Sequence, residues 1–309
     1  MDRFFRYIIE EEQSNQRISS FLMERGFSAK NLKDLKKQER SILRNGVWAY
    51  VNEVLNAGDV LEVMVKEPES SGNIVPVLLP LDIVYEDEDI LIVNKPGNMP
   101  THPSQNHYED TLANAVMYYY AGKDEDFVFR CLNRLDRETS GLTLIAKNMI
   151  SGAMLSRMIR EREIEKEYIA LVEGMIPERG TVDKPIGRVE GSTIERRVDE
   201  LNGESAVTHY TRMNYDEERN VSTVRLWLET GRTHQIRVHM AFIGHPLLGD
   251  GKYGKLTGKL TFTYSTDNPS NHQTKRQALH CARLAFLHPV TKKQMVFEQI
   301  PPEDMSLFI

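Results

Sequence analysis

The sequence predicts an α+β protein whose core is a mixed or antiparallel sheet with flanking helices, preceded by a small α+β domain. Residues 207–213 and 221–229 alternate between apolar and polar side chains, as antiparallel strands do. Strand-like and helical segments do not alternate strictly, which argues against a doubly wound fold. Residues 67–73 have the Pro-, Ser- and Gly-containing composition of a linker, so we expect two domains.

Bulk composition is that of a folded globular protein. The 309 residues are 40% apolar and 27% charged, which argues against global disorder and allows more than one domain. The net charge of -6 argues against a nucleic-acid partner for the chain as a whole. Residues 25–44, however, hold seven basic and two acidic side chains, so this segment is locally basic.

Cysteine use and hydropathy indicate a cytoplasmic protein. Cys131 and Cys281 lie far apart and form no paired spacing typical of zinc or redox sites, so we expect reduced thiols. The first residues lack the apolar core of a signal peptide, and no apolar run is long enough to span a bilayer. No heptad pattern or large apolar face stands out, so a monomer is expected.

Local signals predict two short helices near the front of the chain. Ser14 or Asn15 is expected to cap the first helix, and Gly26 to end it in a left-handed conformation. Ser28 is expected to cap the second helix, which buries its leucines and exposes its lysines.

Three strands should complete the front domain. Asn45-Gly46 lies between two strand-like runs and is a strong hairpin signal. Residues 60–65 supply the third strand. The resulting division is a front domain, a linker and a main domain, at residues 1–72, 73–77 and 78–309.

The main domain should contain several more strands and two long helices. Short apolar runs bounded by turn residues predict strands at 83–85, 90–94, 142–146 and 168–172. Helical periodicity predicts helices at 111–120 and 151–162.

One motif organises the main domain. The sequence NRLDRETSGL, residues 133–142, puts the carboxylate of Asp136 between two arginines, ahead of a turn and a strand. Four blocks follow it in order: KEYIALVEG, GRTHQIRVHM, HPLLGDGKYG and LHCARLAFLHP. Together these blocks resemble the RluA-type branch of RNA pseudouridine synthases along most of residues 81–300.

The resemblance implies a mixed sheet with a central cleft, and an isomerase that converts uridine to pseudouridine without a cofactor. It implies three catalytic residues: Asp136 as nucleophile or base, Arg237 as its ionic partner, and Tyr168 stacked on the uracil. Attack on ribose carbon 1 and proton removal from carbon 2 both remain open for Asp136. Asn133 stands where the family usually has His, so details of the substrate loop are expected to differ.

The front domain resembles the alpha-L RNA-binding motif, which implies an RNA partner. Structured ribosomal RNA is the expected substrate, with transfer RNA as the alternative. The expected RNA-binding residues are all basic, at positions Lys30, Lys33, Lys36, Lys37, Arg40, Arg134 and Arg137.

Two further patterns argue against a nucleotide cofactor and a metal. Residues 249–254 fit G-x-G-x-x-G, but residues 255–271 are too polar to open a helix, and Leu256 stands where a P-loop needs Ser or Thr. The histidines fit no common zinc spacing, including those at His234, His239 and His245.

Two rival functions use the same residues. A non-catalytic RNA-binding or ribosome-assembly protein on the same fold would be favoured by loss of a catalytic residue, and none is lost. A glycoside or nucleoside hydrolase needs a second carboxylate, and Glu138 is too close to Asp136 in sequence to be an obvious partner. We therefore expect an RNA uridine isomerase.

Overall fold

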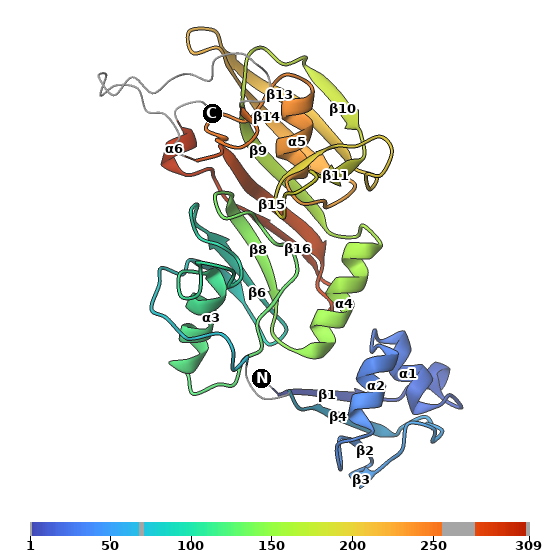
Figure 1. Cartoon of the computed structure of the whole chain (residues 1–309). Coiled ribbons are helices and arrows are strands. Elements are labelled where there is room, and N and C mark those ends of the chain that lie inside the picture. The colour runs from blue at the N-terminus through green and yellow to red at the C-terminus, as the bar shows by residue number, and fades with distance from the viewer. Residues whose placement is uncertain (1, 68–70, 255–275, 307–309) are drawn as a thin grey trace.

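The computed structural model describes residues 2–67, 71–254 and 276–306 (Figure 1). A small four-stranded sheet with two helices lies at one end of the molecule, below a long ten-stranded sheet. A two-stranded ribbon, β11 (Ile186–Arg188) with β12 (Arg196–Val198), accompanies the large sheet. None of the described helices is long and apolar enough to cross a bilayer.

The small sheet has the strand order β1-β4-β2-β3. Its strands are β1 (Arg3–Ile8), β2 (Ile42–Arg44), β3 (Val47–Trp48) and β4 (Val60–Val65), all antiparallel to their neighbours. A 3-10 turn, η1 (Glu11–Gln13), precedes helices α1 (Ile18–Glu24) and α2 (Ala29–Leu35). β1 was not among the expected strands, because its sequence, RFFRYI, does not alternate between polar and apolar residues, although its burial in the structure does.

The expected cap of the first helix is wrong. The N-cap of α1 is Arg17, which makes no side-chain cap bond. Ser14 instead accepts a hydrogen bond from the backbone of Ala57, and the Asn15 N–H donates to the carbonyl of Leu55. Both candidate capping residues are therefore hydrogen-bonded to a loop that is distant in sequence.

The other local signals in this domain are confirmed. Gly26 has φ +91° just after α1, and the Ser28 hydroxyl accepts from the Asn31 N–H at 3.1 Å to cap α2. Asn45 and Gly46 both have positive φ, +52° and +78°, as a two-residue hairpin turn requires.

The large sheet runs β10-β13-β14-β9-β15-β8-β6-β5, with β16 paired to β15 and β7 to β8. Among the described strands, β15 and β8 form the one parallel pair of this sheet. The predicted mixed, mainly antiparallel core is thus confirmed. The strands are β5 (Ile83–Glu86), β6 (Ile90–Lys95), β7 (Arg130–Cys131), β8 (Ser140–Ala146), β9 (Glu165–Glu173), β10 (Arg179–Asp183), β13 (Val207–Asp216), β14 (Val221–Leu228), β15 (Leu279–Leu287) and β16 (Gln294–Glu298).

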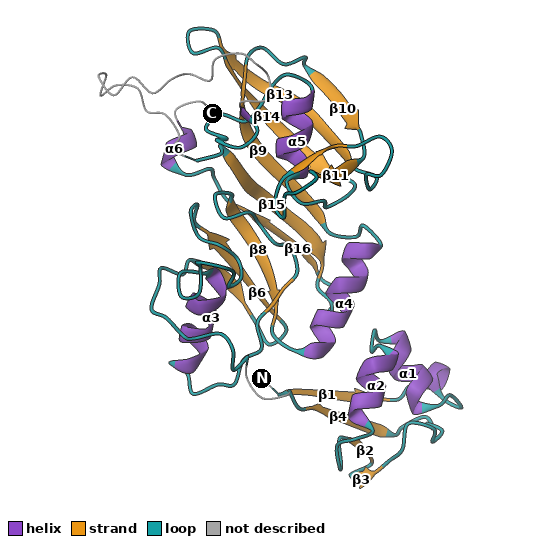
Figure 2. Cartoon of the chain, viewed as in Figure 1, coloured by secondary structure: helices purple, strands orange, loops and turns teal. Residues whose placement is uncertain are grey.

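Helices cover both faces of this sheet (Figure 2). On β6, Ile90 and Ile92 join one core with α4 (Met149–Arg160) and α5 (Gln235–Phe242), while Leu91 and Val93 join another with α3 (Leu112–Ala121). A last helix, α6 (Glu303–Ser306), buries Met305 against β9.

The two long helices were predicted with small errors at their starts. α3 begins at Leu112 rather than at residue 111, because Thr111 is its N-cap and accepts from the Asn114 N–H. α4 begins at Met149 rather than at residue 151, because the Asn148 side chain accepts from the backbone of Ile150 and Ser151.

α4 also joins the small sheet to the large one. Leu155 and Met158 face the large core, whereas Ile150 and Met154 complete the core under the small sheet. A Cβ atom added to Gly26 would come within 2.8 Å of the Met154 side chain, so the two parts meet closely.

Candidate active site

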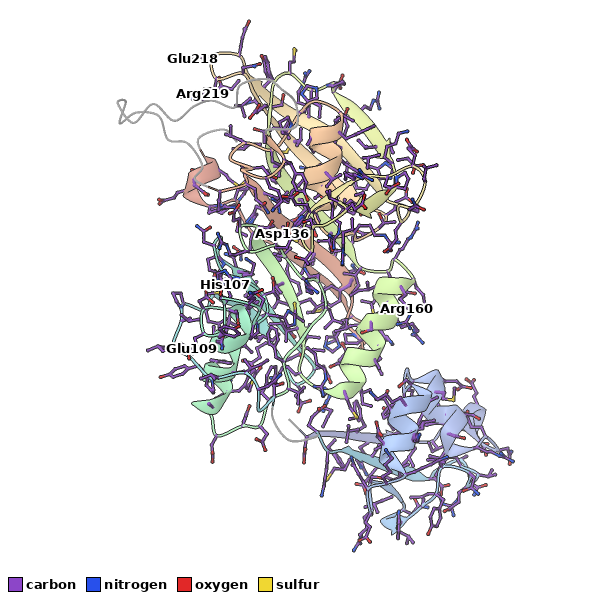
Figure 3. The ribbon with its side chains drawn as sticks, viewed as in Figure 1. His107, Glu109, Asp136, Arg160, Glu218 and Arg219 are labelled. Carbon is purple, nitrogen blue, oxygen red and sulfur yellow. The ribbon has the colours of Figure 1, made fainter. Side chains whose placement is uncertain are left out.

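The loop that carries Asp136 lies at the parallel junction of the large sheet. It enters β8, whose backbone passes so close to β15 that a Cβ on Gly141 would lie 2.3 Å from the Cys281 carbonyl oxygen. Gly141 has φ +114°, which a side chain rarely permits. The Thr139 N–H donates to the Asp136 carbonyl and closes the turn. Figure 3 shows Asp136 near the middle of the large sheet.

Asn133, which departs from the family pattern, fastens this loop to β8. Its side-chain amide donates to the Leu142 carbonyl at 2.9 Å and accepts from the Leu144 N–H at 2.6 Å. Because Asn133 is buried, these bonds satisfy polar atoms that would otherwise be costly. In this chain the residue has a structural role in the loop.

An ionic chain holds the carboxylate of Asp136. Arg237, from α5, donates through Nη1 to Asp136 Oδ2 at 2.9 Å. Its other edge binds Asp250 in a bidentate pair, at 2.7 Å through Nε and 2.9 Å through Nη2. The fork geometry of arginine allows it to serve both carboxylates at once.

Burial and charge act in opposite directions on this chain. Burial of Asp250 acts to raise its pKa, but the hydrogen bonds and charge of Arg237, together with the N–H groups of Tyr253 and Lys252, lower it overall. Burial would likewise lower the pKa of Arg237, yet the two carboxylates raise it. Arg237 is therefore a fixed positive charge beside Asp136.

The structure brings the three expected catalytic residues to one pocket. Asp136, Tyr168 and Arg237 line it together with Arg134 and His234. Tyr168 comes from β9 and is 7% exposed. Burial, followed by Cys281 and Asp136, raises the pKa of Tyr168 well above 10, so its hydroxyl stays protonated at neutral pH.

The expected RNA-binding arginines of this loop differ in position. Arg134 is exposed and lines the pocket. Arg137 is exposed beside the pocket, with Nη1 3.4 Å from the His107 ring and Nη2 3.6 Å from Glu138.

Five basic residues of the front domain are expected to bind RNA, and none of them lines the pocket. All five are exposed, and Lys37 pairs with Asp34 at 3.1 Å. The side chains of the others make no hydrogen bond or ion pair within the described ranges, so their charges face solvent. They are Lys30, Lys33, Lys36 and Arg40.

Sequence reasoning missed a buried lysine under the loop. Lys95 has no exposed surface and donates to the carbonyls of Pro96 and Met99 at 2.8 Å and of Arg137 at 3.2 Å. Burial, with the nearby charge of Arg276, lowers the pKa of Lys95 to about 7. In sequence, Lys95-Pro96-Gly97 indicates only the end of the strand at 90–94, and no local pattern marks the lysine as buried.

Arg276 was also missed, and it holds the far side of the loop. Its guanidinium donates to the Glu138 carbonyl at 2.8 Å and the Ser140 hydroxyl at 3.2 Å. Asp304 of α6 binds the same arginine at 2.8 Å. These contacts join segments far apart in sequence, so no local pattern reveals them.

Asp250 lies inside the G-x-G-x-x-G pattern, which gives this segment a role unrelated to nucleotide binding. One oxygen of Asp250 accepts from the backbone of Lys252 and Tyr253 at 3.0 and 3.1 Å. The segment is thereby wrapped around the carboxylate that holds Arg237. Residues 255–271, expected to be non-helical, lie outside the described residues.

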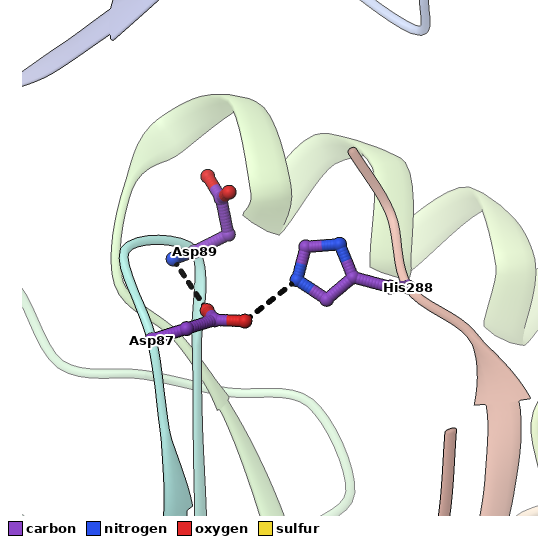
Figure 4. A group of neighbouring side chains, drawn as sticks. All are labelled: Asp87, Asp89 and His288. Carbon is purple, nitrogen blue, oxygen red and sulfur yellow. Dashed lines mark hydrogen bonds and ion pairs between the residues drawn. The ribbon is translucent and has the colours of Figure 1, made fainter. Parts of the chain in front are cut away.

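A separate group of possible metal ligands occurs at the β5–β6 turn (Figure 4). Asp87 accepts from the Asp89 N–H at 2.8 Å and lies 3.0 Å from the His288 ring. Asp89 is bound by Arg3 at 3.0 Å and by Asn148 at 2.9 Å. Since each carboxylate already has partners, the group is a hydrogen-bonded joint between segments rather than an open ligand set.

Comparison with known proteins identifies the class of protein to which this fold and pocket belong. The family model described as RNA pseudouridylate synthase matches residues 89–242. The chain belongs to the RNA pseudouridine synthases, in their RluA-type branch, and is thus an isomerase that acts on uridines in RNA.

Two bacterial relatives match nearly the whole chain, and a human structure matches most of it. It is 38% identical to an uncharacterized RNA pseudouridine synthase, YjbO, of Bacillus subtilis, over 94% of this chain and 98% of that protein. It is 35% identical to the ribosomal large subunit pseudouridine synthase D of Escherichia coli, over 96% and 90%. Human RNA Pseudouridylate Synthase Domain Containing 1 has a TM-score of 0.56 at 30% identity, over 72% of this chain and 83% of that one.

Proposed function

We propose that this protein isomerises uridines in ribosomal RNA, with Asp136 as the carboxylate that acts on the ribose. The observation that carries the proposal is the ionic chain Asp136–Arg237–Asp250, of which Asp136 and Arg237 line the pocket. Several relatives are named ribosomal large subunit pseudouridine synthases, which supports ribosomal RNA over transfer RNA.

The reaction needs one ionised carboxylate and no redox change. The bond from N1 to ribose C1′ breaks, and its electron pair stays on the base. The base turns, C5 joins C1′, a proton leaves C5, and N1 takes up a proton. In one route Asp136 bonds to C1′ while the base is detached, and in the other it takes the C2′ proton. Both routes require Asp136 beside the ribose in its charged form.

Arg237 and Tyr168 serve this carboxylate and the base. Arg237 holds Oδ2 of Asp136 in place with a charge-assisted hydrogen bond. The Tyr168 ring stacks on the uracil, and its protonated hydroxyl donates a hydrogen bond to the base or orients a water that takes up the C5 proton.

The substrate uridine must leave its stack to reach the pocket. Arg134 is exposed on the pocket wall, where its guanidinium can fill the vacated space or bind a flanking phosphate. Arg137, exposed beside it, is a second phosphate contact.

We propose that residues 1–72 form an alpha-L-like domain that holds the RNA, and that residues 78–309 form the catalytic domain. Support comes from the exposed basic side chains along α2, which suit the sequence-independent binding of a phosphate backbone. The contact residues are Lys30, Lys33, Lys36, Lys37 and Arg40.

We further propose that the protein works in the cytoplasm as a monomer. Cys131 and Cys281 are free thiols, and burial raises the pKa of each to about 12, which suits a reducing compartment. Light scattering should give the mass of one chain, and a dimer mass would reject the monomer.

RNA transcribed with uridine tritiated at C5 tests the activity directly. Wild-type protein should release tritium to water from ribosomal RNA, and Asp136→Asn should release none. Release from transfer RNA alone would reassign the substrate. Binding without release, on a panel of both RNAs, would favour an assembly factor, and free uracil would indicate a hydrolase.

A further inference from the structure

His234 has a backbone conformation that few non-glycine residues adopt. It stands at the N-cap of α5 with φ +58° and ψ 20°. The next residue, buried Gln235, fixes the turn: it accepts from the Thr230 hydroxyl at 2.8 Å and the Arg232 N–H at 3.0 Å, and donates to the Val207 carbonyl at 2.9 Å. Such strain persists where the surroundings impose it, often at functional sites.

This conformation directs the imidazole at the reacting carboxylate. The His234 side chain is 9% exposed, and its Nε2 lies 3.6 Å from Asp136 Oδ2. Arg237 donates to the same oxygen. No hydrogen bond or ion pair from the described residues reaches Oδ1 of Asp136. The two carboxylate oxygens therefore have different surroundings: Oδ2 accepts from Arg237, whereas Oδ1 has no partner among the described residues.

Tyr253 determines which imidazole nitrogen carries the proton. The Tyr253 oxygen accepts from the Arg196 N–H at 3.0 Å and lies 2.8 Å from His234 Nδ1. Tyr253 is 2% exposed, and within the described ranges Nδ1 is the one hydrogen-bond acceptor for its buried hydroxyl proton. A neutral imidazole that accepts at Nδ1 carries its proton on Nε2, which here points at Asp136.

The charge state of His234 agrees with this assignment. Burial lowers its pKa below 6.5, even though Asp136 acts to raise it, so the ring is neutral at neutral pH. His239 and His245 are engaged elsewhere, with the Thr208 hydroxyl and the Glu173 carbonyl. His234 thus acts alone rather than as one of a set of metal ligands.

We propose that His234 is a positioning residue for Asp136: its Nε2–H, aimed by Tyr253, joins Arg237 in holding Oδ2, so that Oδ1 is the oxygen that reacts with the ribose. The inference rests on the proposed function of Asp136. A 3.6 Å separation without substrate is compatible with this role, because catalytic hydrogen bonds often tighten only when substrate binds.

Both routes of the reaction gain from this asymmetry. In the covalent route, a lone pair of Oδ1 forms the bond to C1′ while the N1–C1′ pair leaves with the base. In the elimination route, Oδ1 takes the C2′ proton, the C2′–H pair becomes the C1′–C2′ double bond, and the base again leaves with the N1 pair. Fixing Oδ2 with two donors restricts rotation of the carboxylate and keeps Oδ1 towards the ribose.

Four variants test the proposal by single-turnover tritium release and by RNA dissociation constants. His234→Leu should slow release by about ten- to a hundredfold, the range for a hydrogen bond to a charged group, with RNA affinity within about twofold. His234→Gln, whose amide reaches the place of Nε2, should recover much of the rate. Tyr253→Phe should slow release by about tenfold. The double variant H234L/Y253F should be no slower than H234L.

The control is Tyr215→Phe, which removes a hydroxyl that bonds Asn220 at 2.8 Å on an exposed turn. It should release tritium at the wild-type rate.

Several outcomes would overturn the proposal. A wild-type rate in H234L or Y253F rejects the role of His234, and multiplied losses in the double variant reject the action of Tyr253 through it. If H234L does not fold, Y253F still decides, because it leaves the imidazole in place. Failure of the proposed function itself is distinguishable: wild type would then release no tritium, or Asp136→Asn would release it.

Discussion

Asp250 shows how a residue that does not contact Asp136 determines the orientation of the arginine that does. It reaches the reaction only through Arg237, whose remaining N–H it leaves free for Asp136. Without Asp250, the arginine would keep one carboxylate partner and lose its fixed orientation. The buried charge would then be incompletely compensated.

Asp250→Asn should therefore lower tritium release by about a hundredfold and the free energy of unfolding by about 3 kcal/mol. Single-turnover kinetics and urea denaturation measure the two effects. The matched control is Asp216→Asn, which breaks an exposed pair with Arg219 and should leave both near wild type. Equal behaviour of the two variants would contradict the role of Asp250.

Lys95 gives the protein a stability that depends on pH. Its folded pKa of about 7 lies below the 10.5 of the unfolded chain, so the unfolded state binds more protons between these values. Stability therefore rises with pH across this window, by about 1 kcal/mol per unit. The difference in unfolding free energy between wild type and Lys95→Met should grow from pH 7 to 10. A constant difference would show that Lys95 does not titrate in the folded protein.

At the scale of elements, the contact between β8 and β15 leaves no room for a side chain. Gly141→Ala would put a methyl group 2.3 Å from a backbone oxygen, at φ +114°. The strands would have to separate, so we expect a loss of about 3 kcal/mol or more and little tritium release.

Gly58→Ala separates the cost of the steric clash from the cost of the positive φ. Gly58 has φ +84°, but nothing lies within 4 Å of the added methyl group. It should cost only about 1 kcal/mol, from the backbone conformation alone. Thermal unfolding of both variants measures the difference. A loss in G141A no larger than in G58A would mean that β8 and β15 can move apart freely.

Local sequence signals predicted helices, strands and turns better than they predicted hydrogen bonds between residues far apart in sequence. Ser28 and Asn45-Gly46 act within a few residues, so their cap and turn could be predicted. Ser14 and Asn15 could not, because loop residues some forty positions later bind them. The prediction of a cap residue from local sequence fails wherever tertiary hydrogen bonds compete with local ones.

The residues of the site also differ in whether they could be predicted from local sequence. The pocket residues Asp136, Tyr168 and Arg237 were expected from the family motif. Asp250 and His234 were not, since they approach Asp136 only after three distant segments meet on the sheet. Their contacts are a product of the fold and carry no local signature.

At the scale of the whole molecule, binding and chemistry should be separable. Lys33 and Lys36 lie exposed on or just after α2, outside the pocket, and are two of the proposed phosphate contacts. The double change Lys33→Ala and Lys36→Ala should weaken binding to structured RNA and reduce the slope of log affinity against log salt by about 2. The rate from saturated complex should stay at the wild-type value. A fall in that rate with an unchanged slope would refute the assignment.

The parallel pair β8–β15 also has a consequence for synthesis of the chain. β15 is a central strand, yet it follows β5 to β14 in sequence and must insert between β8 and β9. Until it has left the ribosome, the two halves of the sheet have no common backbone ladder, and the loop of Asp136 lacks the contacts of Arg276. Contacts of such long range slow folding. A nascent chain of this protein should thus be catalytically silent, acquiring activity only after its late central strand has been translated.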